Sequence, residues 1–403
     1  MHFAYQYILL AAGVFIILNL LVSRFASRFG APTLLATLAI GLLFGNGGEY
    51  GFDYNFPNAT LHLSELALCI IIFTGGFEAR WKSFRPILRQ GISLATLGVI
   101  FTMLVVAALA HLLLNWPWIQ ALLLGAVVSA TDAAAVFSIL ENSKLKLKPG
   151  VRETLELESG ANDPMAYFLT FSLTALLMPF GSELGILHLA GDFLWTMIVG
   201  LGTGLLAGKA IHLLVLRVPL KKGQFPIVLL AWVLILYAVN SILGGSAFLS
   251  VYIAGMILGN SPWAQRDINV HFFESLSWLM ETSLFLILGL QVYLFDLPGV
   301  IWEGLLLALG LIFLARPIGV AVSLSMIKNI DWQQKAFYAW VGLRGATPIV
   351  FALIPVVNKV EGASKIFNIA FVIVTASILI QGTTVAYAAR ITRQKKKSGT
   401  PTA

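Results

Sequence analysis

The chain has 403 residues, of which 58% are hydrophobic and only 11% are charged. A soluble domain carries about 25% charged residues, so the composition excludes an ordinary soluble protein and indicates a membrane protein. The net charge of +7 does not indicate a nucleic-acid partner, because the basic residues cluster in short loops between apolar segments.

Hydropathy and turn residues predict thirteen membrane spans, most of them near or above the about 20 residues that a crossing needs. With the N-terminus outside, the loops after odd-numbered spans face the cytoplasm, and most of the 26 basic residues fall in them. We therefore expect a multi-pass protein of the cell (inner) membrane with a cytoplasmic C-terminus. In chain order the spans are 5–22, 31–46, 60–78, 90–114, 117–140, 151–178, 186–216, 225–242, 246–260, 271–293, 299–327, 333–356 and 365–389.

Two of these spans carry a buried charge, and the second of them contains signs of a broken helix. Span 5 carries Thr131 and Asp132 at mid-depth, and span 12 carries two glycines and a proline around Arg344. Broken helices are tolerated in a membrane where they line a cavity inside the protein. Spans 5 and 12 are seven apart, so they run in opposite directions. This predicts an inverted-topology repeat, spans 4–6 against spans 11–13, with a site between them.

Span 6 places several polar groups near the middle of the bilayer. Ser159 and Asp163 are four residues apart and share a helix face, and Glu158 and Asn162 share the neighbouring face. An ionised carboxylate at this depth is costly unless it is paired, hydrated or bound to an ion. Oxygen ligands of this kind suit a hard monovalent cation. Together with Asp132, they predict a cation or proton site.

The buried acids require compensation. Arg316 in span 11 lies about 16 Å from the cytoplasmic end of its helix, and Glu158 lies about 11 Å from that end of span 6. We expect a two-point ion pair between them, which leaves Asp163 free to bind a proton or a cation. Arg344 adds positive charge in the crossing region, either for Asp132 or for the carbonyl ends of half-helices.

Three further residues complete the predicted site region. Pro164 disfavours helical geometry at the preceding Asp163 and can free a backbone carbonyl as a ligand. Glu281 lies near the middle of span 10, and Glu65 lies about one turn from the outer face of span 3. For both glutamates, lining a cavity and making structural hydrogen bonds remain open.

The chain resembles the monovalent cation:proton antiporter family, which includes bacterial sodium/proton and potassium/proton antiporters and animal sodium/proton exchangers. The resemblance covers nearly the whole chain, and residues 132–137 and 160–165 look most like the potassium/proton branch. It implies thirteen helices, an inverted repeat with broken crossing helices at spans 5 and 12, and a homodimer. The motifs that carry it are residues 130–132, 158–164, 315–317 and 342–346.

The resemblance also implies roles for single residues. Asp163 is the carboxylate shared by the proton and the cation, and Thr131, Asp132 and Ser159 lie near the ion. Asn162 is similar to the asparagine of electroneutral members. The resemblance implies no cofactor apart from the transported ions, and it makes Glu158 and Arg316 a structural ion pair.

The same resemblance divides the chain into six regions. These are dimerisation-side helices 1–3 (1–86), core helices 4–6 (87–180), linking helix 7 (181–222), scaffold helices 8–10 (223–297), core helices 11–13 (298–391) and a basic cytoplasmic tail (392–403).

Two departures from the family pattern affect these expectations. Many members have a proline after the Thr-Asp pair, whereas this chain has Ala133, so the break in span 5 is less secure. Members of the potassium branch usually continue into a cytoplasmic regulatory domain, so we expect a membrane-only member or a truncated chain.

The expected function is electroneutral exchange of potassium, or sodium, for protons by alternating access, with both ions competing at Asp163. This makes the protein a secondary transporter and not an enzyme. One alternative is a cation channel or a cation-coupled solute symporter, although no filter sequence or organic-ligand pocket is visible. Another is an intramembrane aspartyl protease, which usually carries a Gly-x-Gly-Asp motif and would leave Arg316 unexplained.

Overall fold

A computed structural model gives the fold of the chain, and its regular elements are helices, as the composition predicted. The first predicted span and the predicted basic tail lie partly outside the described residues. The described residues are 6–7, 9–10, 13–21, 33–46, 51, 53–143, 145–178, 185–218, 221–263, 266–328, 330–392 and 394.

Predicted spans 2 to 13 each overlap helical structure. Seven helical runs in the described part are long and apolar enough to cross a membrane, and shorter apolar helices accompany them. The count of thirteen crossings stays a prediction. The first half of the chain contains α2 (Thr33–Phe44), α3 (Pro57–Glu78), α4 (Trp81–Phe84), η1 (Arg85–Ile87), α5 (Leu88–Ser93), η2 (Leu94–Gly98), α6 (Val99–Leu114), α7 (Trp118–Val127), α8 (Ala133–Asn142) and α9 (Val151–Leu177). The second half contains α10 (Ile186–Arg217), η4 (Lys222–Gln224), α11 (Phe225–Leu243), α12 (Ala247–Gly259), α13 (Arg266–Gln291), η5 (Leu294–Gly299), α14 (Ile301–Gly310), η6 (Leu311–Ala315), α15 (Arg316–Ser323), α16 (Trp332–Trp340), α17 (Ala346–Val357), α18 (Ala363–Ser377), η7 (Ile378–Gly382) and α19 (Thr383–Ile391).

Both predicted helix breaks are present. Residues 128–132 separate α7 from α8, and residues 341–345 separate α16 from α17. The two non-helical stretches meet, because the backbone N–H of Asp132 donates to the carbonyl oxygen of Leu343 at 2.8 Å. The break in span 5 therefore forms although Ala133 stands where many family members have proline.

The inverted repeat is visible in matching irregularities. Span 4 contains the π-helical turn η2, and its predicted counterpart, span 11, contains the π-helical turn η6. The two spans pack against each other, and the Ser93 hydroxyl donates to the carbonyl oxygen of Ser323 at 2.7 Å. A π-helical turn changes the register of the helix that follows it, and Arg316 is the first residue after η6.

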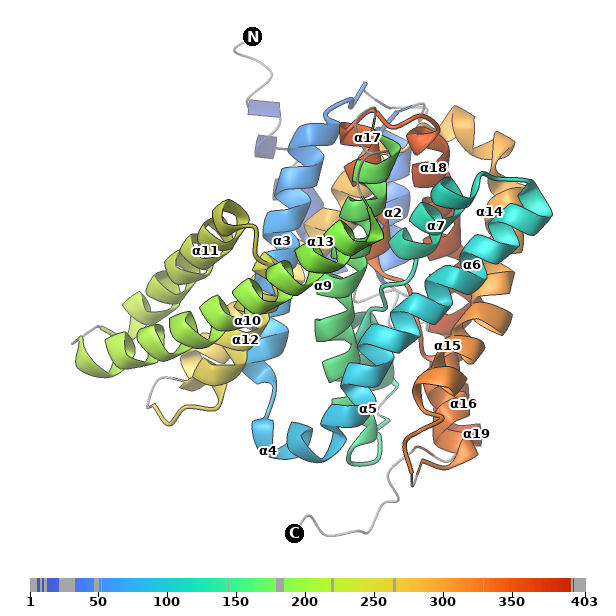
Figure 1. Cartoon of the computed structure of the whole chain (residues 1–403). Coiled ribbons are helices and arrows are strands. Elements are labelled where there is room, and N and C mark those ends of the chain that lie inside the picture. Colours follow the sequence, from blue (N-terminus) through green and yellow to red (C-terminus); the bar gives the residue numbers. More distant parts are fainter. Residues whose placement is uncertain are drawn as a thin grey trace.

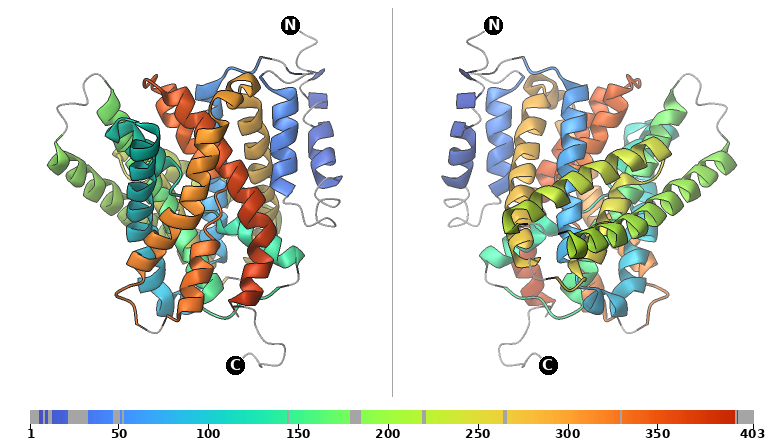
Figure 2. Two further views of the ribbon diagram at one scale, coloured as in Figure 1. Left: turned by 90° about the vertical axis from the view of Figure 1, so that its right-hand side faces the viewer. Right: turned by 90° about the vertical axis from the view of Figure 1, so that its left-hand side faces the viewer.

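The helices form two groups on either side of a central set. In Figure 1, α3, α9 and α13 lie at the centre, α10, α11 and α12 on one flank, and α6, α14 and α15 on the other. The short α4, with Arg80 and Arg85 beside it, lies at the same end as the end of α19, which carries Arg390. We call this the basic end. The start of α3 and the end of α17 lie at the opposite end (Figures 1 and 2).

Candidate functional site

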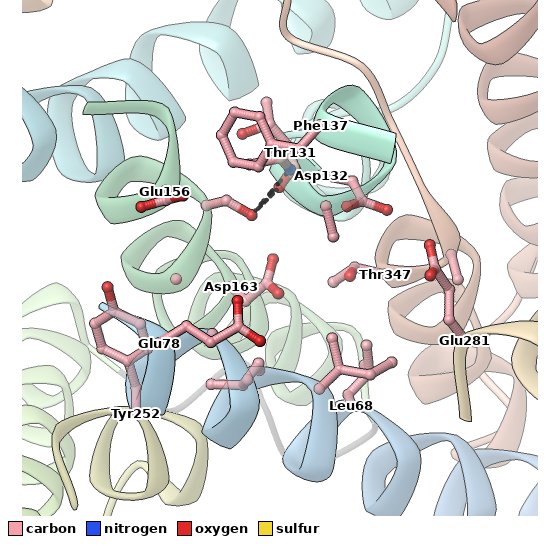
Figure 3. A pocket seen from close by; sticks show the side chains of 18 of the residues that line it. Leu68, Glu78, Thr131, Asp132, Phe137, Glu156, Asp163, Tyr252, Glu281 and Thr347 are labelled. Carbon is pink, nitrogen blue, oxygen red and sulfur yellow. Dashed lines mark hydrogen bonds between the residues drawn. The ribbon is translucent and has the colours of Figure 1, made fainter. Parts of the chain in front are cut away.

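A cavity of about 500 Å³ leads from the basic end to the helix breaks. Its walls come from α3, α8, α9, α12, α13 and α17. Figure 3 shows the carboxylates of Asp132, Asp163 and Glu281 and the hydroxyl of Thr347 around this space. Sequence elements that are far apart therefore bring three acids to one cavity.

Asp163 lies at the deep part of this cavity. Its side chain is buried, with 6% of the residue exposed, and it projects from the middle of α9. Its Oδ1 atom has no hydrogen-bond partner within the described part of the chain. A buried carboxylate oxygen without a partner is costly in this environment, so this atom is suited to bind a proton or a cation.

Ser159 and Asn162 connect α9 to the break in span 5. The Ser159 hydroxyl donates to the carbonyl oxygen of Thr131 at 3.0 Å and accepts the backbone N–H of Ala133 at 3.2 Å. The Asn162 amide donates to the Thr131 hydroxyl at 2.6 Å. The amide oxygen of Asn162 is buried and has no hydrogen-bond partner in the described ranges. These residues therefore hold the break in place next to Asp163.

Asp132 has a structural contact as well as a place in the cavity wall. Its Oδ1 atom accepts the backbone N–H of Ala135 at 3.1 Å, so it caps the N-terminus of α8. A Cβ atom at Gly345 would overlap its carboxylate, which explains why a glycine stands there. Asp132 also lines the cavity.

Glu158 and Arg316 form the two-point ion pair that their depths predicted. The guanidinium donates to Oε1 at 2.5 Å and to Oε2 at 3.0 Å, and both side chains are almost fully buried. Arg316 also donates to the carbonyl oxygen of Tyr338, in the last turn of α16, at 3.1 Å. Gly342 leaves room for the Arg316 side chain. Glu158 is thus held in a pair and does not line the cavity.

Arg344 donates hydrogen bonds to backbone carbonyls at the C-terminal end of a half-helix. It is fully buried, and its Nη1 donates to the carbonyl oxygens of Ser129 and Ala130, the latter at 2.7 Å. These carbonyls follow directly after α7, where the helix dipole is negative. Two partners were predicted for Arg344, and the structure shows hydrogen bonds to the carbonyl end of α7 and not to Asp132.

The prediction that Pro164 disturbs the helical geometry at Asp163 was wrong. α9 runs without interruption from Val151 to Leu177 with Pro164 inside it. The long helix packs against several neighbours, and this packing outweighs the local preference of the residue before proline. Because proline has no N–H, the carbonyl of Gly160, which lines the cavity, lacks its usual helical partner. The carbonyl that Pro164 leaves free therefore belongs to Gly160, one turn earlier, and the helix continues through Asp163.

Sequence reasoning missed Thr347 and the charged mouth of the cavity. Thr347, in the first turn of α17, faces Asp163 across the cavity (Figure 3). Its place directly after the glycines of span 12 was a signal that could have identified it. Glu281 also lines the cavity. The mouth at the basic end carries Glu78, Glu156 and Glu274 together with Arg152, which pairs with Glu156 at 2.7 Å.

The fold and site define a polytopic membrane protein with crossed helix breaks around a buried acid. Residues 14–390 match the family described as "Sodium/hydrogen exchanger, transmembrane", and the chain belongs to this family. A structure of the sodium proton antiporter MjNhaP1 from Methanocaldococcus jannaschii has a TM-score of 0.82 and 25% sequence identity, with 94% of this chain and 96% of that chain covered. The fold class is therefore confirmed.

Proteins named as antiporters are similar in sequence. The K(+)/H(+) antiporter NhaP2 of Shewanella sp. (strain ANA-3) is 40% identical over 375 residues, which is 93% of this chain and 65% of the relative. The K(+)/H(+) antiporter NhaP of Alkalimonas amylolytica is 38% identical and covers 95% of this chain and 66% of its own length. The Na(+)/H(+) antiporter 1 of M. jannaschii is 28% identical, with 88% and 84% covered. The chain thus spans about 65% of the length of the first of these relatives.

Proposed function

We propose that the chain exchanges a monovalent cation for a proton across the membrane, and that both ions use Asp163. The observation that carries this proposal is the buried Oδ1 of Asp163 at the deep part of the cavity, which has no hydrogen-bond partner among the residues that the structure describes. The nearby acid Glu158 is held by Arg316, so it is not free to take part. One carboxylate cannot hold a proton and a cation at once, and this mutual exclusion is what exchange requires.

The surrounding groups suit a cation with oxygen ligands. The carboxylates of Asp163 and Asp132 supply charge, and Thr131, Ser159 and Asn162 supply hydroxyl and amide oxygens nearby. Replacing one proton by one monovalent cation leaves the charge of the site unchanged, so exchange is electroneutral. We propose potassium as the favoured cation, with sodium as the second candidate, because the relatives near 40% identity are named K(+)/H(+) antiporters. No cofactor is included in this scheme.

Neither alternative function is favoured. A channel needs a continuous path, whereas Asp163 is the deepest residue of α9 that lines the cavity from the basic end. A protease needs two acids that share one water, whereas Asp132 caps α8 through Oδ1. The relatives are named antiporters, and this supports exchange further.

We further propose that the basic end faces the cytoplasm, with the N-terminus outside and the C-terminus inside. The cavity then opens inward. We propose that the predicted core regions, 87–180 and 298–391, move against the remaining helices in a homodimer, so that Asp163 faces each side in turn.

Reconstituted protein tests this function directly. Vesicles with an imposed pH gradient and a pH-sensitive dye report proton efflux when each alkali cation is added in turn. We expect dye recovery with potassium and, more weakly, with sodium, and no recovery for Asp163→Asn. Lys209→Met, an exposed basic residue of α10, is a control that should exchange normally. Cation-driven recovery in Asp163→Asn would contradict the proposal, and a flux that follows membrane potential would indicate a channel.

A further inference from the structure

A second cavity approaches the same part of α9 from the opposite end of the protein. It has a volume of about 430 Å³ and is lined by α9, α10, α11 and α12. On α9 the first cavity reaches Asp163, and the second reaches Pro164 and Tyr167. One helical turn rises about 5.4 Å, so the two cavities end within about one turn of each other along this helix.

Tyr167 fills the region between the two cavities. Its ring makes edge-on contacts with Phe248 of α12, at a centroid distance of 5.1 Å, and with Phe351 of α17, at 5.5 Å. Edge-on aromatic contacts of this kind are favourable and exclude water. The ring therefore closes the short path that would join the second cavity to Asp163.

A partly buried hydrogen bond holds Tyr167 in this position. Its hydroxyl donates to Oε1 of Glu65, on α3, at 2.9 Å. The Glu65 side chain is only 11% exposed, and its other oxygen lies 3.4 Å from the ring of His62, near the start of α3. A hydrogen bond to a carboxylate is among the stronger ones, and it is stronger still where water is excluded.

The contacts of Tyr167 join two pairs of helices, α3 with α12 and α9 with α17. α3 and α12 are in close backbone contact, because Gly76 lies against the backbone of Tyr252 and Gly255 lies against that of Phe73. Glu65 and Phe248 are thus fixed to each other through tightly packed helices. Asp163 and Thr347 are carried instead by α9 and α17. A shift of α9 and α17 against α3 and α12 must break the contacts of Tyr167 with Glu65 and Phe248.

We propose that the hydrogen bond between Tyr167 and Glu65 is a latch that keeps the second cavity closed to Asp163. It must break before the ion site can open toward the end opposite to the basic end. Both are positioning residues, which act on the balance between two access states without contacting the ion. The proposal rests on the exchange function only because exchange by alternating access requires both access states.

Reporter cysteines measure this balance without any transport. In a Cys69→Ser background, Ser138→Cys places a thiol in the first cavity. Val251→Cys places one at a fully buried position of α12, between Phe248 of the second cavity and Tyr252 of the first. Each reporter reacts with a charged thiol reagent in detergent, where both ends are accessible. The ratio of the labelling rate at position 251 to that at position 138 then reports the balance of access states.

We expect Tyr167→Phe to raise this ratio by about tenfold, because a hydrogen bond to a charged group corresponds to about that factor in an equilibrium constant. Glu65→Gln should shift the ratio in the same direction. The double variant should shift it no further than the larger single change, because both substitutions weaken one bond. Thr170→Val is the matched control. It removes a buried hydroxyl of α9 that has no hydrogen-bond partner among the described residues, and it should leave the ratio unchanged.

A ratio within about twofold of the parent in both Tyr167→Phe and Glu65→Gln would overturn the latch. The equilibrium between the two access states would then change by less than the loss of one hydrogen bond should change it. This outcome leaves the exchange function standing if the parent protein still exchanges ions in vesicles. Conversely, a parent that exchanges no ions refutes the exchange function, while the labelling ratio still decides the latch.

Discussion

Removing Arg316 while keeping Glu158 separates two accounts of their buried pair. Arg316→Met retains the length and apolar character of the side chain but leaves the Glu158 carboxylate and the Tyr338 carbonyl without this donor. If the pair acts only through hydrogen bonds, the cost is small, because hydrogen bonds between membrane helices average about 0.6 kcal/mol. If an uncompensated buried charge dominates, the cost is about 3–5 kcal/mol.

We predict the larger value, because both side chains are almost fully buried and lie outside the cavity that could supply water. The double variant Glu158→Leu with Arg316→Met removes both charges and should cost less than Arg316→Met alone. Reversible unfolding in mixed micelles, followed by circular dichroism, gives the free energy of unfolding for each variant.

The control is Lys209→Met, which removes an exposed basic residue from a span and should change stability by less than about 0.5 kcal/mol. An Arg316→Met cost near 1 kcal/mol, or a double variant less stable than Arg316→Met, would refute the reasoning about charge compensation.

Three further predictions concern the helix breaks and the ion site. Arg344→Gln should lower the free energy of unfolding by about 1–3 kcal/mol in the same unfolding assay, because two buried carbonyls lose a charged donor. Gly345→Ala should abolish dye recovery in vesicles, because its Cβ would overlap the Asp132 carboxylate, whereas Gly202→Ala, whose Cβ meets nothing within 4 Å, should exchange normally. Lowering the pH should raise the potassium concentration for half-maximal exchange, by up to about tenfold per pH unit in the acid range, because a proton on Asp163 excludes the cation. A half-maximal concentration that is independent of pH would contradict this competition.

Patterns of buried charge predicted the parts of the site that are expensive in a membrane. Asp163, Glu158 and Arg316 are ionisable, so each demands a partner or a function at mid-depth, and the helical rise indicates which residues share a depth. Glycine and proline around Arg344 likewise predicted the break in span 12, whereas the crossed break in span 5 was implied by the family resemblance. The positions of these groups along the chain were enough to predict the site, because the free-energy cost of burying an ionised group in a membrane does not depend on fine packing.

Tertiary packing decided the remaining features. Tyr167 and Thr347 are weakly polar residues in apolar runs, and nothing local indicates which neighbours they meet. Pro164 remains inside a regular helix because surrounding helices hold α9. Arg344 had two possible partners at one depth, and only the direction of its side chain shows that it serves the end of α7.

Counting protons released when potassium binds to purified protein tests the central claim most directly. Calorimetric titration in buffers that differ in ionisation enthalpy gives this number without vesicles or transport. On the acid side of the working range, we predict that the number approaches one proton per potassium ion in the parent protein, and that Asp163→Asn neither binds potassium nor releases a proton. Potassium binding without proton release at any pH, or an unchanged release in Asp163→Asn, would contradict competition at this carboxylate.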